Sequence, residues 1–158
     1  SPSLLCVVAL STVLIAALAT QEQAREQRMR GAYVDPNGVR WDTNNADYEG
    51  VMLKKSKWMG EWRKRYLILK GTKIFFAKDE ESAPHGMMDL VDCVSVKSAE
   101  NKAKKRYALE IELKSESFVM VAGSEREKDG WISRVSRAIV GASSIYLQDD
   151  PQEEGAGA

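Results

Sequence analysis

The sequence predicts a mainly β fold, a small antiparallel barrel whose open end is plugged by one C-terminal α-helix. Between residues 48 and 122, short runs of β-favouring residues alternate with loops rich in Gly, Ser or charge, as in antiparallel meanders. At residue 124 the apolar spacing changes from a period of two to a helical period. A meander of short strands has exposed edges and two open ends, and closure around a helix removes both.

The chain starts with a hydrophobic segment, residues 1–20, in which no charge occurs from Leu4 to Ala19. A helix over that stretch rises about 24 Å, short of a ~30 Å hydrocarbon core unless the flanks join the helix. The segment is interpreted as a membrane anchor or a signal peptide, with an artefact of where the sequence was cut or translated as a third alternative. Because the chain begins with Ser1 rather than Met, we expect a fragment or a processed chain.

The residues that follow this segment support different alternatives. The small residues from Ala17 to Ala19 are typical of a signal-peptide cleavage site, although a basic n-region is missing. An anchor would be followed by Arg25, Arg28 and Arg30 and preceded by no charge. The positive-inside rule then places the remainder of the chain at the cytoplasmic face of a membrane. We favour the anchor.

Residues 21–47 are predicted to be a linker. From Gln21 to Arg30 the residues favour a helix but lack an apolar stripe, so a helix there is solvated or continues the anchor. From Gly31 to Asp47 the sequence is rich in turn signals, such as the run from Asp35 to Gly38. We expect Trp41 to pack against the domain that follows.

Strands are expected over residues 51–54, 63–70, 72–78, 107–113 and 118–122, with two further short strands within residues 87–96. In the stretch 107–113, apolar residues alternate with acids. We therefore expect its odd positions to face the core, and Glu110 and Glu112 to face water.

One amphipathic helix is predicted after the strands. Ser124 and Glu127 form a capping box at its start. The apolar residues that recur at helical spacing are Trp131, Val135, Ala138 and Ile139. Gly141 is expected to end the helix. The acidic, Gly- and Ala-rich tail, residues 142–158, is predicted to be disordered because it has little to bury.

The order of these elements and four stretches of residues resemble a pleckstrin-homology (PH) domain over about residues 48–141. The stretches are Gly50–Lys54, Trp62–Leu69, Pro84–Gly86, and Glu125–Val140 with its Trp131. The similarity is strongest to the short plant proteins that hold a single PH domain. The resemblance implies a seven-stranded, antiparallel, two-sheet barrel capped by one C-terminal helix, and it says nothing of residues 1–47.

The run from Gly50 to Lys78 carries nine Lys or Arg and one acid, Glu61, although the whole chain has a formal net charge of zero. Such a charge favours an anionic partner, either lipid headgroups or nucleic acid. The alternative is a solvated strand edge that lysines protect from aggregation. In PH domains that bind phosphoinositides, the first strand's lysine and two basic residues of the second strand hold the phosphates. The resemblance assigns these roles to Lys54, Arg63 and Arg65, with Lys57, Lys64 and His85 as secondary contacts.

Alternation along the second strand supports this assignment. Arg63 and Arg65 share a face with Leu67 and Leu69, at the rim of a core-facing row. Two guanidinium groups there can donate bidentate hydrogen bonds to phosphate, and Lys54 across the hairpin adds a point charge. The predicted ligand is a phosphoinositide or another anionic lipid headgroup.

The loop between the two strands carries Trp58 and Met59 among lysines, which predicts contact with a membrane interface. The alternative is that Trp58 folds back onto the barrel. His85 stands where lipid-binding PH domains often have arginine, so the resemblance favours a simply phosphorylated headgroup over a multiply phosphorylated one. A protonated histidine can donate to phosphate, so we expect stronger binding in acid.

These features predict a phosphoinositide-binding module at a membrane surface. The alternative function is a PH-fold protein–protein interaction module with weak or no lipid binding. Nucleic acid is a less favoured partner, because only Trp58, Trp62 and Tyr66 are placed to stack on bases. The sequence contains no Gly-rich phosphate loop, clustered metal ligands or nucleophile–base pair, so no enzyme activity, cofactor or metal is predicted.

Overall fold

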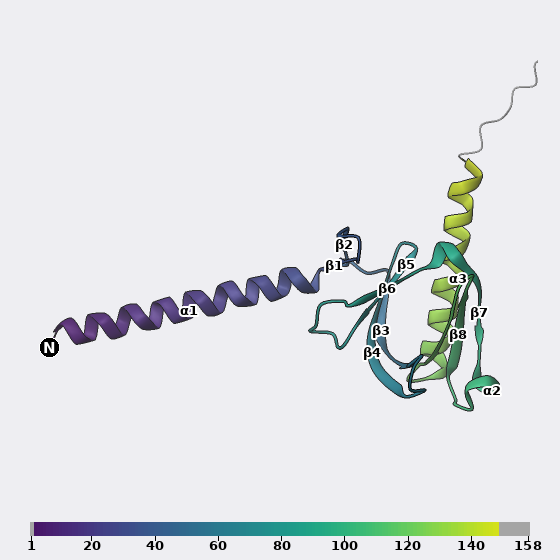
Figure 1. The fold of residues 1–158 in the computed structure, drawn as a ribbon, viewed down its shortest axis with the longest axis horizontal. Coiled ribbons are helices and arrows are strands. Elements are labelled where there is room, and N and C mark those ends of the chain that lie inside the picture. The colour runs from purple at the N-terminus through teal and green to yellow at the C-terminus, as the bar shows by residue number, and fades with distance from the viewer. Residues whose placement is uncertain (1, 149–158) are drawn as a thin grey trace, which may run out of the picture.

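The computed structural model describes the backbone of residues 2–148 and the side chains of residues 3–23 and 31–143. In chain order, its elements are α1 (Pro2–Arg30), β1 (Ala32–Val34), β2 (Arg40–Asp42), β3 (Tyr48–Lys55), β4 (Trp62–Lys70), β5 (Lys73–Ala77), β6 (Gly86–Asp89), the 3-10 helix η1 (Leu90–Asp92), β7 (Cys93–Ser98), α2 (Glu100–Ala103), β8 (Ala108–Leu113), β9 (Ser117–Val121) and α3 (Glu125–Gln148). Helix α1 projects as a rod from the β domain, and α3 lies along the curved sheet (Figure 1).

Seven of the strands form one antiparallel sheet in the order β6-β5-β4-β3-β9-β8-β7. Between β3 and β9 only two residue pairs are in register, Leu53 with Val121 and Lys54 with Met120, so the sheet divides there into two halves. Helix α3 packs against β7, β8 and η1 (Figure 1). The predicted mainly β fold, with seven antiparallel strands and one C-terminal helix, is confirmed.

One face of each strand in the seven-stranded sheet contributes to a common core, which also includes Leu90 of η1. Its fully buried side chains include Met52, Leu67, Leu69, Ile74, Met88, Leu90, Leu109, Ile111 and Met120. Trp131 of α3 joins this core with 2% of its surface exposed, and the ring of Tyr48 meets it edge-on with centroids 4.8 Å apart. A Cβ on Gly130 would lie 2.5 Å from the Tyr48 hydroxyl, so a side chain at this position would have to displace the Tyr48 ring. Trp131 is thus the large apolar plug that the helical spacing predicts.

The start of α3 follows the predicted capping box. The Ser124 hydroxyl accepts a hydrogen bond from the backbone N–H of Glu127 at 3.2 Å. The Glu127 carboxylate accepts from the backbone N–H of Gly123 at 2.8 Å, one residue before the position expected for a capping box. Two backbone donors at the helix start are therefore satisfied.

The stretch predicted to be a linker is folded over most of its length. Helix α1 continues to Arg30, and β1 and β2 form an antiparallel hairpin in which Tyr33 pairs with Trp41. Tyr33 is 9% exposed and meets Phe75 edge-on at 5.8 Å, and Trp41 packs on the same cluster as expected. The linker prediction over residues 21–47 is corrected accordingly. Local turn signals cannot indicate that these aromatic side chains gain burial against strands distant in the sequence.

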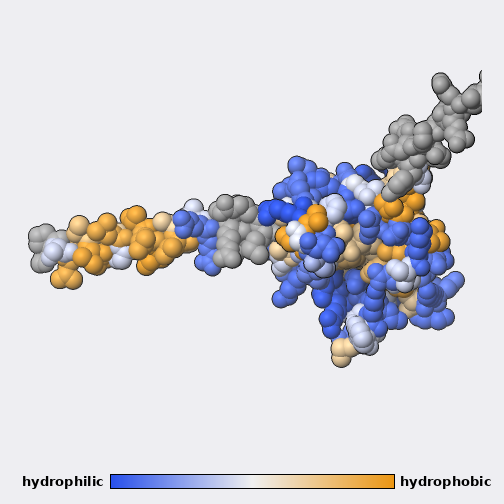
Figure 2. Space-filling model, turned by 45° about the horizontal axis from the view of Figure 1, so that its top comes forward, coloured by the Kyte–Doolittle hydropathy of each residue, from blue (hydrophilic) through white to orange (hydrophobic). Residues whose placement is uncertain are grey.

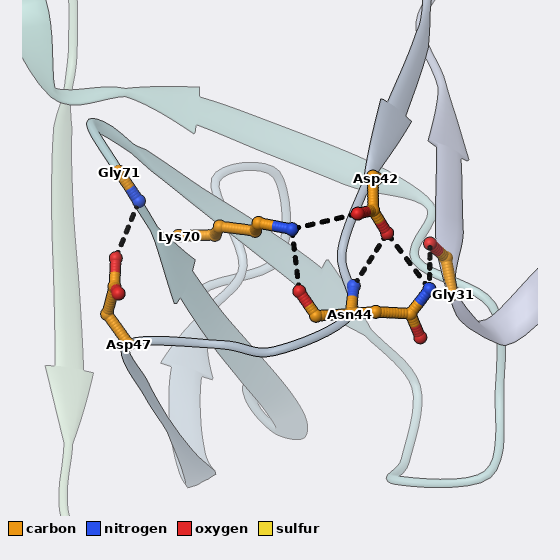
Figure 3. A network of polar contacts seen from close by, with 6 residues as sticks. All are labelled: Gly31, Asp42, Asn44, Asp47, Lys70 and Gly71. Carbon is orange, nitrogen blue, oxygen red and sulfur yellow. Dashed lines mark hydrogen bonds and ion pairs between the residues drawn. The ribbon is translucent and has the colours of Figure 1, made fainter.

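Polar contacts hold the hairpin to the turn between β4 and β5 (Figure 3). The Lys70 ammonium donates to Asp42 Oδ2 at 2.9 Å and to the Asn44 carbonyl at 2.6 Å. The Asp47 carboxylate accepts from the backbone N–H of Gly71 at 2.7 Å. Gly71 has a φ of 59°, which the two-residue turn between the strands requires. The folded domain therefore includes the hairpin before β3.

We expect a fragment that lacks residues 1–47 to be less stable than one that lacks residues 1–30 by about 2–4 kcal/mol. Removing the hairpin exposes the outer face of β4 and β5 and deletes the buried Tyr33 side chain. A fully buried large apolar side chain contributes about 1.5–3 kcal/mol. Urea denaturation followed by circular dichroism gives both free energies of unfolding. Equal values for the two fragments would contradict a structural role for the hairpin.

Helix α1 is long and apolar enough to span a membrane over Ser3–Gln23, judged by length and composition. At 1.5 Å per residue this window rises about 31 Å, close to a ~30 Å hydrocarbon core. The residues after Ala19 continue the helix and give it the length that a membrane anchor needs. None of this window is buried, and Figure 2 shows its apolar surface outside the β domain.

The alternation in β8 predicts an exposed Glu110, but Glu110 is 4% exposed. The short helix α2 brings Lys102 onto the Glu110 carboxylate, and the Ser117 hydroxyl donates to the same carboxylate. The hydrogen bond from Lys102, and then that from Ser117, hold the pKa of Glu110 below its usual value. Alternation correctly separates Glu110 from its core-facing neighbours Leu109 and Ile111, but it cannot indicate what covers the second face of a strand.

Helix α3 extends past Gly141 to Gln148, so the predicted helix end at Gly141 and the tail expected from residue 142 are corrected. A glycine ends a helix when it adopts a positive φ, and Gly141 does not. Ala142, 6% exposed, continues the buried face of α3, which offsets the ~1 kcal/mol that a helical glycine costs. Residues 149–158 of the predicted tail lie outside the described residues.

Candidate anion-binding site

The register of β3 and β4 brings the predicted basic residues together at one end of the barrel. Lys54 of β3 lies directly opposite Arg63 of β4, and Met52 lies opposite Arg65. Met52 is 1% exposed in the core. Because side chains alternate along a strand, Lys54, Arg63 and Arg65 extend that core-facing row toward solvent.

Two adjoining hollows of about 270 and 330 Å³ open at this end of the barrel. Both are lined by Lys54, Lys57, Arg65 and His85. The first hollow also has Arg63, Lys55 and Trp58 in its wall, and the second has Phe76, Phe118 and Glu116. We call the set of Lys54, Lys57, Arg63, Arg65 and His85 the cationic basin.

Lys54 lies over an aromatic floor. Its Nζ is 5.2 Å from the ring centroid of Phe76 and 5.4 Å from that of Phe118, and the two rings stack 6.0 Å apart. The electron-rich ring faces attract the ammonium without neutralising it. Burial, and then repulsion from Lys57 and the two arginines, lowers the pKa of Lys54. A bound anion would relieve that repulsion.

His85 enters the basin from the loop between β5 and β6. Its backbone N–H donates to the Phe76 carbonyl at 2.8 Å, which fixes the loop where it meets the sheet. Burial first, and then the positive charges of Arg65 and Lys54, lowers the pKa of His85. The imidazole of the empty basin is therefore neutral at neutral pH.

The loop between β3 and β4 projects its apolar tip into solvent. The backbone N–H of Ser56 donates to the Glu61 carbonyl at 2.7 Å, and Gly60 closes the loop with a φ of 64°. Trp58 is 96% exposed and Met59 is 68% exposed, so Trp58 does not fold back onto the barrel. Two large apolar side chains thus stand free beside the basin, as an interfacial contact needs.

Two acids reach the rim of the basin. Glu116, in the turn between β8 and β9, forms an ion pair with Lys57. Glu61 Oε2 lies 3.7 Å from Arg63 Nη2, with both side chains about half exposed, which is the geometry of a weak surface pair. Within the described part of the chain, the Lys54 ammonium makes no ion pair with an acid.

The family follows from comparison with known proteins. A family model described as the PH domain matches residues 46–140. The chain belongs to the PH domain family. Pleckstrin homology domain-containing protein 1 of Arabidopsis thaliana is 31% identical over 116 residues, which cover 63% of this chain and 80% of that protein. A PH domain-containing protein of Dictyostelium discoideum is 28% identical over 102 residues, which cover 63% of this chain and 22% of that protein.

A solved PH domain shares the fold. The C-terminal PH domain of pleckstrin in complex with D-myo-Ins(1,2,3,4,5)P5 is 26% identical, with a TM-score of 0.51. The match covers 59% of this chain and 97% of that domain. The resemblance of the sequence to a PH domain, including the short plant type, is thus confirmed.

Lys64 of this PH domain lies on the opposite face of β4 from the basin. It pairs with Leu53 and alternates with Arg63 and Arg65, so its side chain points away from both hollows. The assignment of Lys64 as a secondary contact is corrected, because residues adjacent in a strand face opposite sides. Lys57 and His85, the other secondary contacts, line both hollows.

Among the residues of the two hollows that sequence reasoning missed are Phe76, Phe118 and Glu116. The two phenylalanines belong to strands far apart in the sequence, and only the meeting of the two sheet halves stacks them beneath Lys54. Glu116 lies in a charged turn without a recognisable motif. The charge count along the chain could not place it beside Lys57.

Proposed function

We propose that this PH domain is a lipid-binding module whose cationic basin holds a phosphate of a phosphoinositide headgroup. The observation that carries the proposal is the convergence of Lys54, Arg63 and Arg65 on one hollow of about 270 Å³, with His85 beside them. The similar domain of pleckstrin, in complex with an inositol phosphate, supports this ligand chemistry. A phosphoinositide presents the same chemistry at a membrane surface.

The basin suits phosphate because its donors are charged and held by the sheet. The two guanidinium groups offer planar pairs of donors that match phosphate oxygens. Lys54 adds a point charge over the two phenyl rings. Repulsion among these cations raises the free energy of the empty basin, and a bound phosphate relieves it. The proposed role is binding and not catalysis.

The proposal places the domain at the cytoplasmic face of a membrane. Trp58 and Met59 enter the interface beside the basin, where a tryptophan ring favours headgroup depth. Each lysine near an anionic surface adds about 1 kcal/mol. The segment Ser3–Gln23 serves as an anchor in this scheme, with a signal peptide as its alternative. An anchored chain would meet the headgroup at a high effective concentration, so a weak site suffices.

Vesicle sedimentation of a fragment without residues 1–30 tests the proposal. We expect binding to phosphatidylcholine vesicles that contain a phosphoinositide and no binding to phosphatidylcholine alone. Met59→Ala changes an exposed residue of the loop tip that lines neither hollow, so it should weaken binding to vesicles while leaving binding of the soluble headgroup unchanged. Failure to bind either vesicle, together with capture of a defined protein partner, would favour the protein-interaction alternative.

Relative to a His85→Gln variant, headgroup binding is expected to strengthen several-fold as the pH falls from about 7.5 to about 5.5. Burial and neighbouring cations depress the pKa of His85 in the empty basin, and a bound phosphate raises it. A group whose pKa rises on binding takes up a proton, so affinity increases as the pH falls. Calorimetric titrations of the wild type and His85→Gln isolate this effect, because titration of the headgroup itself affects both proteins equally. Parallel pH profiles would contradict the role of His85.

A further inference from the structure

The two hollows of the basin differ in charge. Beyond the residues that they share, the first hollow is lined by Arg63 and Lys55, which add positive charge. The second is lined by the carboxylate of Glu116 and by two phenyl rings. An anion that occupies the first hollow meets no acid in its wall, whereas an anion that extends into the second hollow also meets a carboxylate.

Glu116 is held in its place by both backbone and side chain. Its carbonyl accepts from the backbone N–H of Leu113 at 2.7 Å, which closes the turn between β8 and β9. Its carboxylate pairs with Lys57, whose Nζ lies 5.0 Å from the ring centroid of Phe118. The pair joins the β3–β4 loop to the β8–β9 turn beside the second hollow, and 52% of the Lys57 side chain stays exposed.

We propose that Glu116 is a specificity-determining residue of this site. By pairing with Lys57 and repelling anions from the second hollow, it makes the basin select headgroups with one phosphomonoester over headgroups with two. This inference rests on the proposed function. It adds that Glu116 sets the preference for a simply phosphorylated headgroup, which the resemblance had linked only to His85.

The preference for one phosphomonoester over two follows from the negative charge of each phosphate and of Glu116. A phosphomonoester carries about 1.5 to 2 negative charges near neutral pH. One such group fits among Lys54, Arg63 and Arg65 without meeting an acid in the wall of the first hollow. A second group on the same ring that extends into the second hollow must displace Glu116 from Lys57 or lie beside its carboxylate. Glu61 lies near Arg63 but lines neither hollow, so it does not share this role.

Calorimetry of the full chain in detergent micelles tests the proposal with two soluble probes, glycerophosphoinositol 4-phosphate and glycerophosphoinositol 4,5-bisphosphate. In both probes the 1-phosphate stays a diester, as it is in the lipid. Glu116→Gln should raise the affinity for the bisphosphate by about three- to tenfold and for the monophosphate by less than about twofold. Vesicles that carry the same headgroups, compared with plain phosphatidylcholine vesicles, show whether the preference also holds for the lipid.

The matched control is Asp129→Asn. This variant also removes one carboxylate, but Asp129 lies on α3 and lines neither hollow. It should leave both affinities unchanged. Equal gains for the two probes in Glu116→Gln, or no gain, would overturn the role of Glu116 while the binding function stands. If neither the wild type nor Glu116→Gln binds either probe, the proposed function itself fails, and this inference fails with it.

Discussion

Replacing both Arg63 and Arg65 with alanine is expected to lower the affinity for a soluble phosphoinositide headgroup by roughly 30- to 150-fold. A hydrogen bond to a charged partner contributes about 1.5–3 kcal/mol. With 48% of its side chain exposed, Arg63 belongs at the low end of that range. Screening by solvent reduces the sum for these two donors from about 3–6 kcal/mol to about 2–3 kcal/mol, and every 1.4 kcal/mol changes affinity tenfold. Calorimetry on the fragment without residues 1–30 measures the loss.

The matched control for this variant is Lys64→Ala combined with Lys97→Ala. It removes the same charge from the far face of β4 and from β7, where Lys97 lies 3.8 Å from Glu112. Lys64 and Lys97 line neither hollow, and salt screens exposed charges, so we expect this control to stay within about threefold of the wild type. Equal losses in the two double variants would indicate diffuse attraction and would contradict a site at Arg63 and Arg65.

Trp131→Ala is expected to destabilise the domain by about 3–5 kcal/mol, the usual cost of truncating a buried large aromatic side chain. Trp131 is 2% exposed in the main core, and its edge-on contact with Tyr48 fixes α3 to the first strand of the barrel. Since a domain of this size has a total stability of about 5–15 kcal/mol, the loss is a large fraction of it. Urea denaturation of the fragment without residues 1–30 measures the change.

Trp58→Ala is the control for this stability change. Trp58 is 96% exposed at the tip of the β3–β4 loop, so its truncation should change the free energy of unfolding by no more than about 0.5 kcal/mol. A loss below about 1 kcal/mol for Trp131→Ala would contradict its role as the plug of the barrel.

The strands and the C-terminal helix could be predicted because their signals are local. The change of period at Ser124 and the spacing of Trp131 and Val135 depend only on neighbours in the chain. Burial of Glu110 could not be predicted, because its partner Lys102 lies on a helix that covers the outer face of β8. The hairpin was missed for the same reason, since its aromatic residues are buried by distant strands.

The candidate site also contains residues that the sequence could predict and residues that it could not. Lys54, Arg63 and Arg65 could be placed together from strand alternation and from the resemblance, because the hairpin that holds them is continuous in sequence. Phe118 and Glu116 come from β9 and the turn before it, and the pairing of β3 with β9 brings them into the site. Only the three-dimensional fold can supply that part of the basin.

The most direct test of the cationic basin is an NMR titration of the labelled fragment without residues 1–30 with glycerophosphoinositol 4-phosphate. We expect saturable amide shifts that are largest in residues 54–58, in residues 63–65 and at His85. Trp62 and Lys105 lie together on the other side of the β3–β4 hairpin, with Lys105 Nζ 5.5 Å from the Trp62 ring centroid. Shifts centred on those two residues, or no saturable shifts at all, would contradict headgroup binding in the basin.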